Sequence, residues 1–226
     1  MQRLTADKYN PYSAVIDGKV VANVSVNKTD FLWDGKVRHF VQLGTVMTDE
    51  AYRNSVLNFY PKFGFKAAKQ YEYVKEVSGD RECMVEQIPM KEKAAWDEFE
   101  KLIQTGKHGC AFDMTGNTEL NMFYISKYMK NNVYYHKAAD TYVVAEIEGD
   151  ELIINMVISE KEPDLNSLAE AFGGGIRKVR LGFTPKDAAG FRVRELDQDD
   201  TVLHVKGNGF AGFEEAKLMF PLLAHA

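Results

Sequence analysis

The sequence lacks three features that would place the protein in common classes. No apolar run approaches the ~20 residues that a membrane-spanning helix needs, and residues 1–7 contain no apolar segment of the kind found in secretory signals. There is also no long run of basic residues, and the formal net charge is −5, which argues against a surface that coats nucleic acid. We therefore expect a cytoplasmic protein with no membrane partner and no nucleic-acid partner.

Cysteine is scarce, with Cys83 and Cys110 as the two examples. Neither belongs to a Cys-x-x-Cys pair, so we expect neither a disulfide framework nor a cysteine zinc site. We interpret each as a small apolar core residue. Four histidines also lack the spacing of metal ligands, and we interpret them as structural or surface residues: His108, His136, His204 and His225. The sequence therefore predicts no metal site.

Hydrophobic residues make up 45% of the chain, which is enough for a sizeable core. Asp17-Gly18 separates two β-type segments, 13–16 and 19–26, and favours a tight hairpin turn because both positions tolerate a positive φ. Within 19–26 an apolar set of residues alternates with a more polar set, as in a strand with two different faces. Further strands are expected over 37–48 and 66–76.

The second half of the chain repeats the first in outline. A hairpin over 141–158 resembles the first one, and Gly173-Gly174-Gly175 follows a segment with helical spacing. Because these glycines follow a helix and lack a Lys-Ser/Thr sequence, they indicate a helix stop instead of a phosphate loop. The remaining expected elements are helices over 89–104 and 163–172 and strands over 176–183, 191–196 and 201–205.

These elements predict an α+β (α/β) protein with a mostly antiparallel mixed sheet flanked by helices. A polar stretch, 78–82, separates the two halves. We expect two lobes, residues 1–80 and residues 81–226, with the second a degenerate copy of the first.

The most informative segment is 55–65, which reads Ser-Val-Leu-Asn-Phe-Tyr-Pro-Lys-Phe-Gly-Phe. It places Phe59-Tyr60 at the end of a short helix and Gly64-Phe65 at a tight corner before a strand. Upstream, Val46-Met47-Thr48 ends the long strand and Tyr52-Arg53 follows. This order resembles motifs of the GNAT N-acetyltransferase superfamily, whose members bind acetyl-CoA and move its acetyl group to an amine.

The resemblance implies roles for several residues in an acetyl-CoA site. The strand end would bond the pantetheine arm through its backbone, and residues near the following loop would lie beside the phosphates. The cofactor-binding residues implied in this way are Val46, Met47, Thr48, Arg53 and Asn54. Tyr60 would be the general acid, because a phenol near the sulfur can protonate the leaving thiolate.

The general base is not readable from the sequence. His39, Gln42 and Asp49 lie on the long strand or at its end, although Gln42 could only orient a water molecule. The segment 218–223 is strongly apolar and should be buried, which could carry the carboxylate of Ala226 inward. Some two-lobed members of the family use a chain-terminal carboxylate at the active site, but an inert docked tail is the alternative.

Two junctions depart from the family pattern. Asn54 runs directly into Ser55 where a glycine-rich loop, a helix and a strand should follow, a span of roughly 20–30 residues. A similar junction lies at Tyr9-Asn10, where opening helices are expected. We interpret both as positions where a longer natural chain carries further residues, with a natural deletion as the alternative. An intact mass of 25.6 kDa for the expressed protein would refute this interpretation.

The leading functional hypothesis is an acetyl-CoA-dependent N-acetyltransferase in which a primary amine attacks the thioester directly. The acceptor, a small molecule or a peptide, is not identified, and a homo-oligomer is possible. A second hypothesis is a non-catalytic module of the same fold that binds acyl-CoA or another ligand. A third is a structural partner protein that uses the second lobe for dimer contacts.

Overall fold

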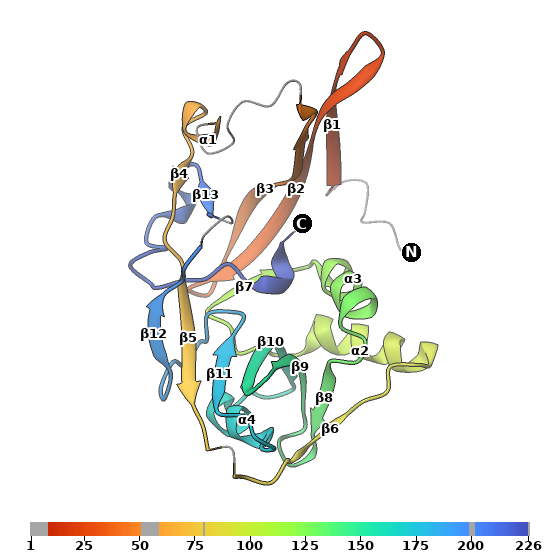
Figure 1. The fold of residues 1–226 in the computed structure, drawn as a ribbon, viewed down its shortest axis with the longest axis vertical. Helices are drawn as coiled ribbons and strands as arrows, with labels where there is room; N and C mark the ends of the chain where they lie inside the picture. Colours follow the sequence, from red (N-terminus) through yellow and green to blue (C-terminus); the bar gives the residue numbers. More distant parts are fainter. Residues whose placement is uncertain (1–8, 51–58, 79, 199–201, 226) are drawn as a thin grey trace.

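The computed structural model describes residues 9–50, 59–78, 80–198 and 202–225. The described strands form two larger sheets and one two-stranded sheet, and the helices lie mainly against the larger of the three sheets (Figure 1). Most strand pairs are antiparallel. The expected α+β fold with a mostly antiparallel mixed sheet is therefore confirmed.

The first sheet has the order β1-β2-β3, formed by β1 (Tyr9–Ile16), β2 (Lys19–Trp33) and β3 (Lys36–Thr48), and β7 (Phe112–Thr115) pairs with the end of β2. Two tight turns connect its first three strands, at Asp17-Gly18 and Asp34-Gly35. All four turn residues have positive φ values of 48°, 77°, 51° and 70°, the conformation that matches the twist of hairpin strands. The expected hairpin and the long strand after it are confirmed.

In part of β2, polar side chains are buried and apolar side chains are exposed, which is the reverse of an ordinary strand. Ser25, Asn27 and Thr29 are buried, whereas Val20 of β2 and Val41 of β3, which pairs with Lys28, are exposed. The alternation seen in the sequence is real, but its polar set is the one that turns inward. A polar inward face indicates that this part of the sheet borders something other than an apolar core.

The second sheet has the order β12-β5-β11-β10-β9-β8-β6. Its strands are β5 (Tyr71–Glu76), β6 (Val85–Gln87), β8 (Val133–His136), β9 (Thr141–Glu148), β10 (Glu151–Ser159), β11 (Lys178–Leu181) and β12 (Arg192–Glu195). The helix α4 (Leu165–Ala171) shares one apolar cluster with this sheet. The helices α2 (Lys93–Thr105) and α3 (Thr118–Tyr128) contribute to a second cluster, which includes residues from the other sheet face.

Strand β5 precedes residue 80 in the chain but lies between β12 and β11, which follow it. Burial explains this position, because Tyr73 and Val74 are buried and the buried Glu72 accepts a hydrogen bond from Arg194 Nε at 2.6 Å. The two halves of the chain therefore share one sheet. The division into lobes at residue 80 stays a prediction about domain organisation. At the second junction noted in the sequence, Tyr9 and Asn10 are the first two residues of the continuous strand β1.

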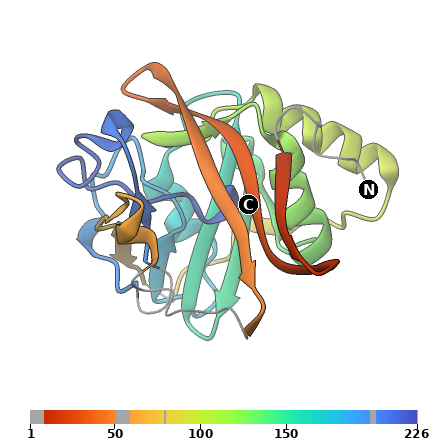
Figure 2. The same ribbon diagram turned by 90° about the horizontal axis from the view of Figure 1, so that it is seen from above.

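The C-terminal segment 213–225 joins the two larger sheets near the centre of the molecule, as both views show (Figure 2). Its side chains share a cluster with Phe31 and Trp33 of β2 and with Phe112 of β7, and Phe31 and Phe112 stack at 4.3 Å. Leu218, Met219, Phe220 and Leu223 are all buried. The expected burial of the apolar tail is confirmed.

Some expectations about single positions are confirmed and others are wrong. Gly173, Gly174 and Gly175 all have positive φ and end α4, as expected of a helix stop. Cys83 is exposed, so its interpretation as a core residue is wrong, whereas burial raises the pKa of the Cys110 thiol well above its ordinary value. No helix in the described ranges is both long and apolar enough to cross a membrane.

Candidate functional site

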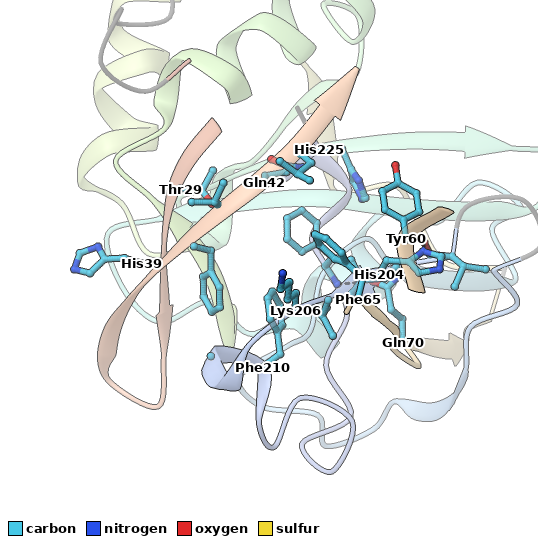
Figure 3. A pocket seen from close by; sticks show the side chains of 18 residues that line it. Thr29, His39, Gln42, Tyr60, Phe65, Gln70, His204, Lys206, Phe210 and His225 are labelled. Carbon is cyan, nitrogen blue, oxygen red and sulfur yellow. Dashed lines mark hydrogen bonds between the residues drawn. The ribbon is translucent and has the colours of Figure 1, made fainter. Parts of the chain in front are cut away.

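A pocket of about 590 Å³ separates β3 from a layer made of α1 (Phe59–Lys62), β4 (Lys66–Ala67) and β13 (His204–Val205) (Figure 3). This volume lies in the range of small-molecule sites. The 3-10 turn η4 (Asn208–Phe210) and the C-terminal segment complete its wall. The described lining residues are Thr29, His39, Phe40, Val41, Gln42, Leu43, Tyr60, Phe65, Gln70, Val202, Leu203, His204, Val205, Lys206, Gly209, Phe210, Phe220 and His225.

The edge of β3 forms one side of the pocket. Five consecutive residues, 39–43, line it, and because side chains alternate between the two faces of a strand, such a run indicates that the strand edge itself borders the space. Among the described strands β3 pairs only with β2. Its other edge therefore offers backbone N–H and C=O groups that an extended ligand could bond as an added strand does.

Two side-chain oxygens at this wall have no hydrogen-bond partner among the described residues: the Thr29 hydroxyl on β2 and the Gln42 amide oxygen on β3. Asn27 Nδ2, whose residue lies opposite Gln42 in the ladder, also has no described partner. Thr29 is 4% exposed and Asn27 6% exposed. A buried polar atom without a partner costs free energy, so this wall is suited to contact a polar group of a ligand.

Aromatic rings hold Tyr60 in place on the opposite side. The Tyr60 ring stacks on His204 with ring centres 4.9 Å apart, and it meets Phe65 edge to face at 5.8 Å. His204 is in turn oriented by its Nδ1, which lies 3.0 Å from the Val202 carbonyl oxygen. Figure 3 shows the Tyr60 hydroxyl directed away from His204.

His225 enters the pocket from the C-terminal segment. Its carbonyl oxygen accepts a hydrogen bond from the Tyr124 hydroxyl at 2.6 Å, and its ring lies 5.0 Å from Phe220. Burial lowers the pKa of the imidazole below its ordinary value of 6.5. His225 is therefore uncharged at neutral pH and able to accept a proton.

The pocket wall carries no negative charge among the described residues. None of the described lining residues is Asp or Glu, whereas Lys206 and three histidines contribute. In the described ranges, no group of three or more His, Cys, Asp and Glu side chains is arranged to hold a metal ion. The chemistry that these residues can perform is hydrogen bonding, aromatic packing and proton transfer.

The predicted site residues are only partly brought together. Tyr60 lines the pocket, but Val46, Met47 and Thr48 lie farther along β3, beyond the last lining residue of that strand, Leu43. Val46 and Met47 are exposed. Arg53, Asn54 and the junction at Ser55 lie outside the described residues, as does Ala226. The roles assigned to all these residues stay predictions.

The three residues considered as the general base have different surroundings in the structure. His39 contributes to the wall, but its ring points away from the pocket (Figure 3) and lies 2.7 Å from Asp30. Asp49 pairs with Lys19 at 2.6 Å. Gln42 faces the pocket but cannot take a proton. These contacts favour neither His39 nor Asp49 as the group that deprotonates a ligand in this pocket.

Two pocket-lining histidines are not among the site residues that the sequence predicts. The sequence indicates structural or surface roles for His204 and His225, and both line the pocket that contains Tyr60. For His225 a signal existed, because the apolar segment before it predicted burial. For His204 none existed, since β13 is only two residues long.

The sequence matches no protein-family model, and no curated protein matches it. Solved structures do resemble the fold. One is a GCN5-related N-acetyltransferase from Kribbella flavida, with 14% identity, a TM-score of 0.52, and an alignment over 82% of this chain and 59% of that chain. Another is a conserved protein of unknown function from Enterococcus faecalis V583, described as a probable N-acyltransferase, with 12% identity, a TM-score of 0.52 and coverage of 88% and 60%. This chain therefore spans less than two thirds of the length of either protein.

Proposed function

We propose, starting from the GNAT fold that this chain has, that the pocket beside β3 is the site of an acetyl-CoA-dependent N-acetyltransferase. The observation that supports this most is the shared wall: an edge of β3 that pairs with no described strand, the phenol of Tyr60 and the neutral imidazole of His225 all line one pocket. Acetyl transfer to an amine needs little more than a held thioester and groups that move protons. The acceptor is a primary amine.

In the proposed reaction the amine nitrogen attacks the thioester carbonyl carbon, and the carbon–sulfur bond breaks as the carbon–nitrogen bond forms. Tyr60 donates its hydroxyl proton to the departing thiolate. His225 takes the proton that the amine nitrogen loses. The products are an amide and the free thiol of CoA, and solvent restores both side chains.

The proposed path of acetyl-CoA follows the open edge of β3. From Leu43 to Thr48 the strand advances about 17 Å, and this part contains Val46, Met47 and Thr48. The backbone there would bond the pantetheine arm, with Arg53 and Asn54 nearer the phosphates. No metal has a role in this proposal.

Calorimetry with acetyl-CoA, followed by an assay of free thiol release with a panel of primary amines, tests the proposal. We expect binding, and thiol release that depends on the amine. Tyr60→Phe should bind acetyl-CoA as before but release thiol at least about 100-fold more slowly, because general acid catalysis is lost. Tyr12→Phe, at an exposed position on β1, is the matched control and should leave the rate unchanged.

Two other results would each favour a different function. Binding of acetyl-CoA without thiol release would contradict the enzyme and favour a non-catalytic acyl-CoA module. Absence of binding would contradict both and favour a structural partner protein.

A further inference from the structure

Aromatic side chains make the pocket suited to bind a ligand with a flat apolar ring. Phe40 and Phe210 face each other with ring centres 4.6 Å apart, and Phe65 and Phe220 add further surface. Rings of this kind pack favourably against another ring, edge to face or offset. A ligand with an aromatic body would bury its apolar surface here.

The β2–β3 wall of the same pocket is suited to bind a neutral hydrogen-bonding group of a ligand. Thr29 Oγ1 and Gln42 Oε1 both lack hydrogen-bond partners in the part of the chain that the structure describes. Thr29 lies opposite Phe40 in the ladder, so a ring against Phe40 is beside the hydroxyl. A ligand hydroxyl can donate to Gln42 and accept from Thr29. Such a group satisfies atoms that are otherwise costly to bury.

The charges around the pocket disfavour a ligand with several positive charges. Lys206, His204 and the neutral imidazole of His225 line it, and no described lining residue is a carboxylate. Moving an ammonium group out of water without a counter-charge is expensive. One amine that loses its proton to react can be accommodated, whereas additional ammonium groups cannot be paired by these residues.

We infer that the acceptor is an aromatic monoamine that carries a neutral hydroxyl or similar hydrogen-bonding group, and not a polyamine. This inference rests on the proposed function for the reaction of the amine, but the binding site itself is defined by Thr29, Gln42, Phe40 and Phe210. The ring of the ligand packs against the phenylalanines on the pocket side, and its hydroxyl reaches Thr29 and Gln42.

Binding of three probes to the full chain tests this inference without turnover. Tyramine has the ring, the hydroxyl and one amine; phenethylamine lacks only the hydroxyl; spermidine has several amines and no ring. By calorimetry we expect tyramine to bind about 5- to 10-fold more tightly than phenethylamine, the effect of one or two neutral hydrogen bonds. Spermidine should bind more weakly than either.

Variants locate the hydroxyl contact. Thr29→Val and Gln42→Leu keep the approximate size of each side chain, and we expect each to reduce the preference for tyramine over phenethylamine. The double variant should abolish the preference while leaving phenethylamine binding within about twofold. Thr141→Val, the same change at a buried strand position outside the pocket, should leave the preference intact.

The inference is overturned if spermidine binds as tightly as tyramine, if the tyramine preference survives in the double variant, or if neither aromatic amine binds. Thiol release from acetyl-CoA, measured with the same amines, distinguishes a failure of this inference from a failure of the proposed function. Tyramine binding without thiol release contradicts the enzyme but keeps the ligand class. Thiol release fastest with spermidine keeps the enzyme and overturns the ligand class.

Discussion

Thr29 and Asn27 occupy buried strand positions that apolar residues usually fill. Each has a side-chain atom without a hydrogen-bond partner in the described ranges, which lowers stability unless another molecule supplies the hydrogen bond. Thr29 lines the pocket and Asn27 lies next to it on the same face of β2, so the protein gives up free energy of folding at and beside the pocket wall. At the scale of single residues, this cost is the clearest physical sign of a binding site.

Thr29→Val should therefore stabilise the ligand-free protein, because it removes a buried hydroxyl without a partner and keeps the side-chain shape. We expect a gain of about 1 kcal/mol, or a rise in Tm of roughly 2–4 °C for a chain of this size. Thr141→Val should have the opposite effect, since the Thr141 hydroxyl donates to the Ala139 carbonyl at 2.9 Å. Thermal unfolding of both variants checks the prediction, and a loss of stability in both would contradict it.

His225 should be visible in the pH dependence of acetyl transfer. Because burial lowers the pKa of its imidazole, the group stays neutral until the pH falls below 6.5, and kcat/KM should decline only as the pH drops through that lowered pKa. In His225→Gln the rate should fall by about 100-fold and the acidic decline should disappear. His39→Gln changes a ring that points away from the pocket and serves as the control. An unchanged acidic decline in His225→Gln would exclude His225 as the base.

At the scale of elements, turn chemistry and strand length decide what could be predicted. The hairpins of β1–β2 and β9–β10 were predictable because Asp17-Gly18 and Gly149 mark turns between long apolar segments. Strands β6, β7 and β8 contain three or four residues each, too few for a period of two to stand out. The pairing of β5 with β11 and β12 depends on contacts far apart in sequence, and no local pattern carries that information.

His108 links the end of α2 to β7, and this link should depend on pH. Its two ring nitrogens lie 2.9 Å from Asp113 Oδ2 and 3.1 Å from the Ile103 carbonyl oxygen, which are both acceptors. Burial opposes the charge on the ring, but the contacts with Asp113 and Ile103 outweigh it and raise the pKa of His108 above 6.5. A raised folded-state pKa adds stability that is fully present below the unfolded-state value and is lost as the pH rises through the folded-state value.

We therefore expect His108→Gln to cost more stability at about pH 5.5 than at about pH 8.5. Urea unfolding of the wild-type protein and the variant at both pH values measures the difference. A difference that is equal at the two values, or larger at the higher one, would show that His108 is not held in its charged form.

At the scale of the whole molecule, the C-terminal segment couples the two sheets to the pocket. Its apolar side chains join the aromatic cluster of β2 and β7, and the Phe220 amide donates to Gln70 at 2.8 Å. The same segment places His225 at the pocket wall. The sequence predicted Tyr60 from its motif and the burial of the tail from its composition, but the meeting of the two is a product of the global fold.

Tyr124→Phe tests this coupling from outside the pocket wall. Without the hydroxyl that holds the His225 carbonyl, the imidazole should lose its fixed position, and kcat should fall about 10-fold. The free energy of unfolding should change by about 1 kcal/mol or less. Tyr128→Phe, on the same helix and exposed, should change neither. An unaltered kcat in Tyr124→Phe would mean that the tail is an inert docked segment.

The most direct test of the proposed site is a crystal structure of the protein with acetyl-CoA bound. The account predicts the pantetheine arm along the open edge of β3 and the thioester sulfur within hydrogen-bonding distance of the Tyr60 hydroxyl, about 3–3.5 Å. Acetyl-CoA bound at another surface, or a Tyr60 hydroxyl turned away from the sulfur, would contradict it.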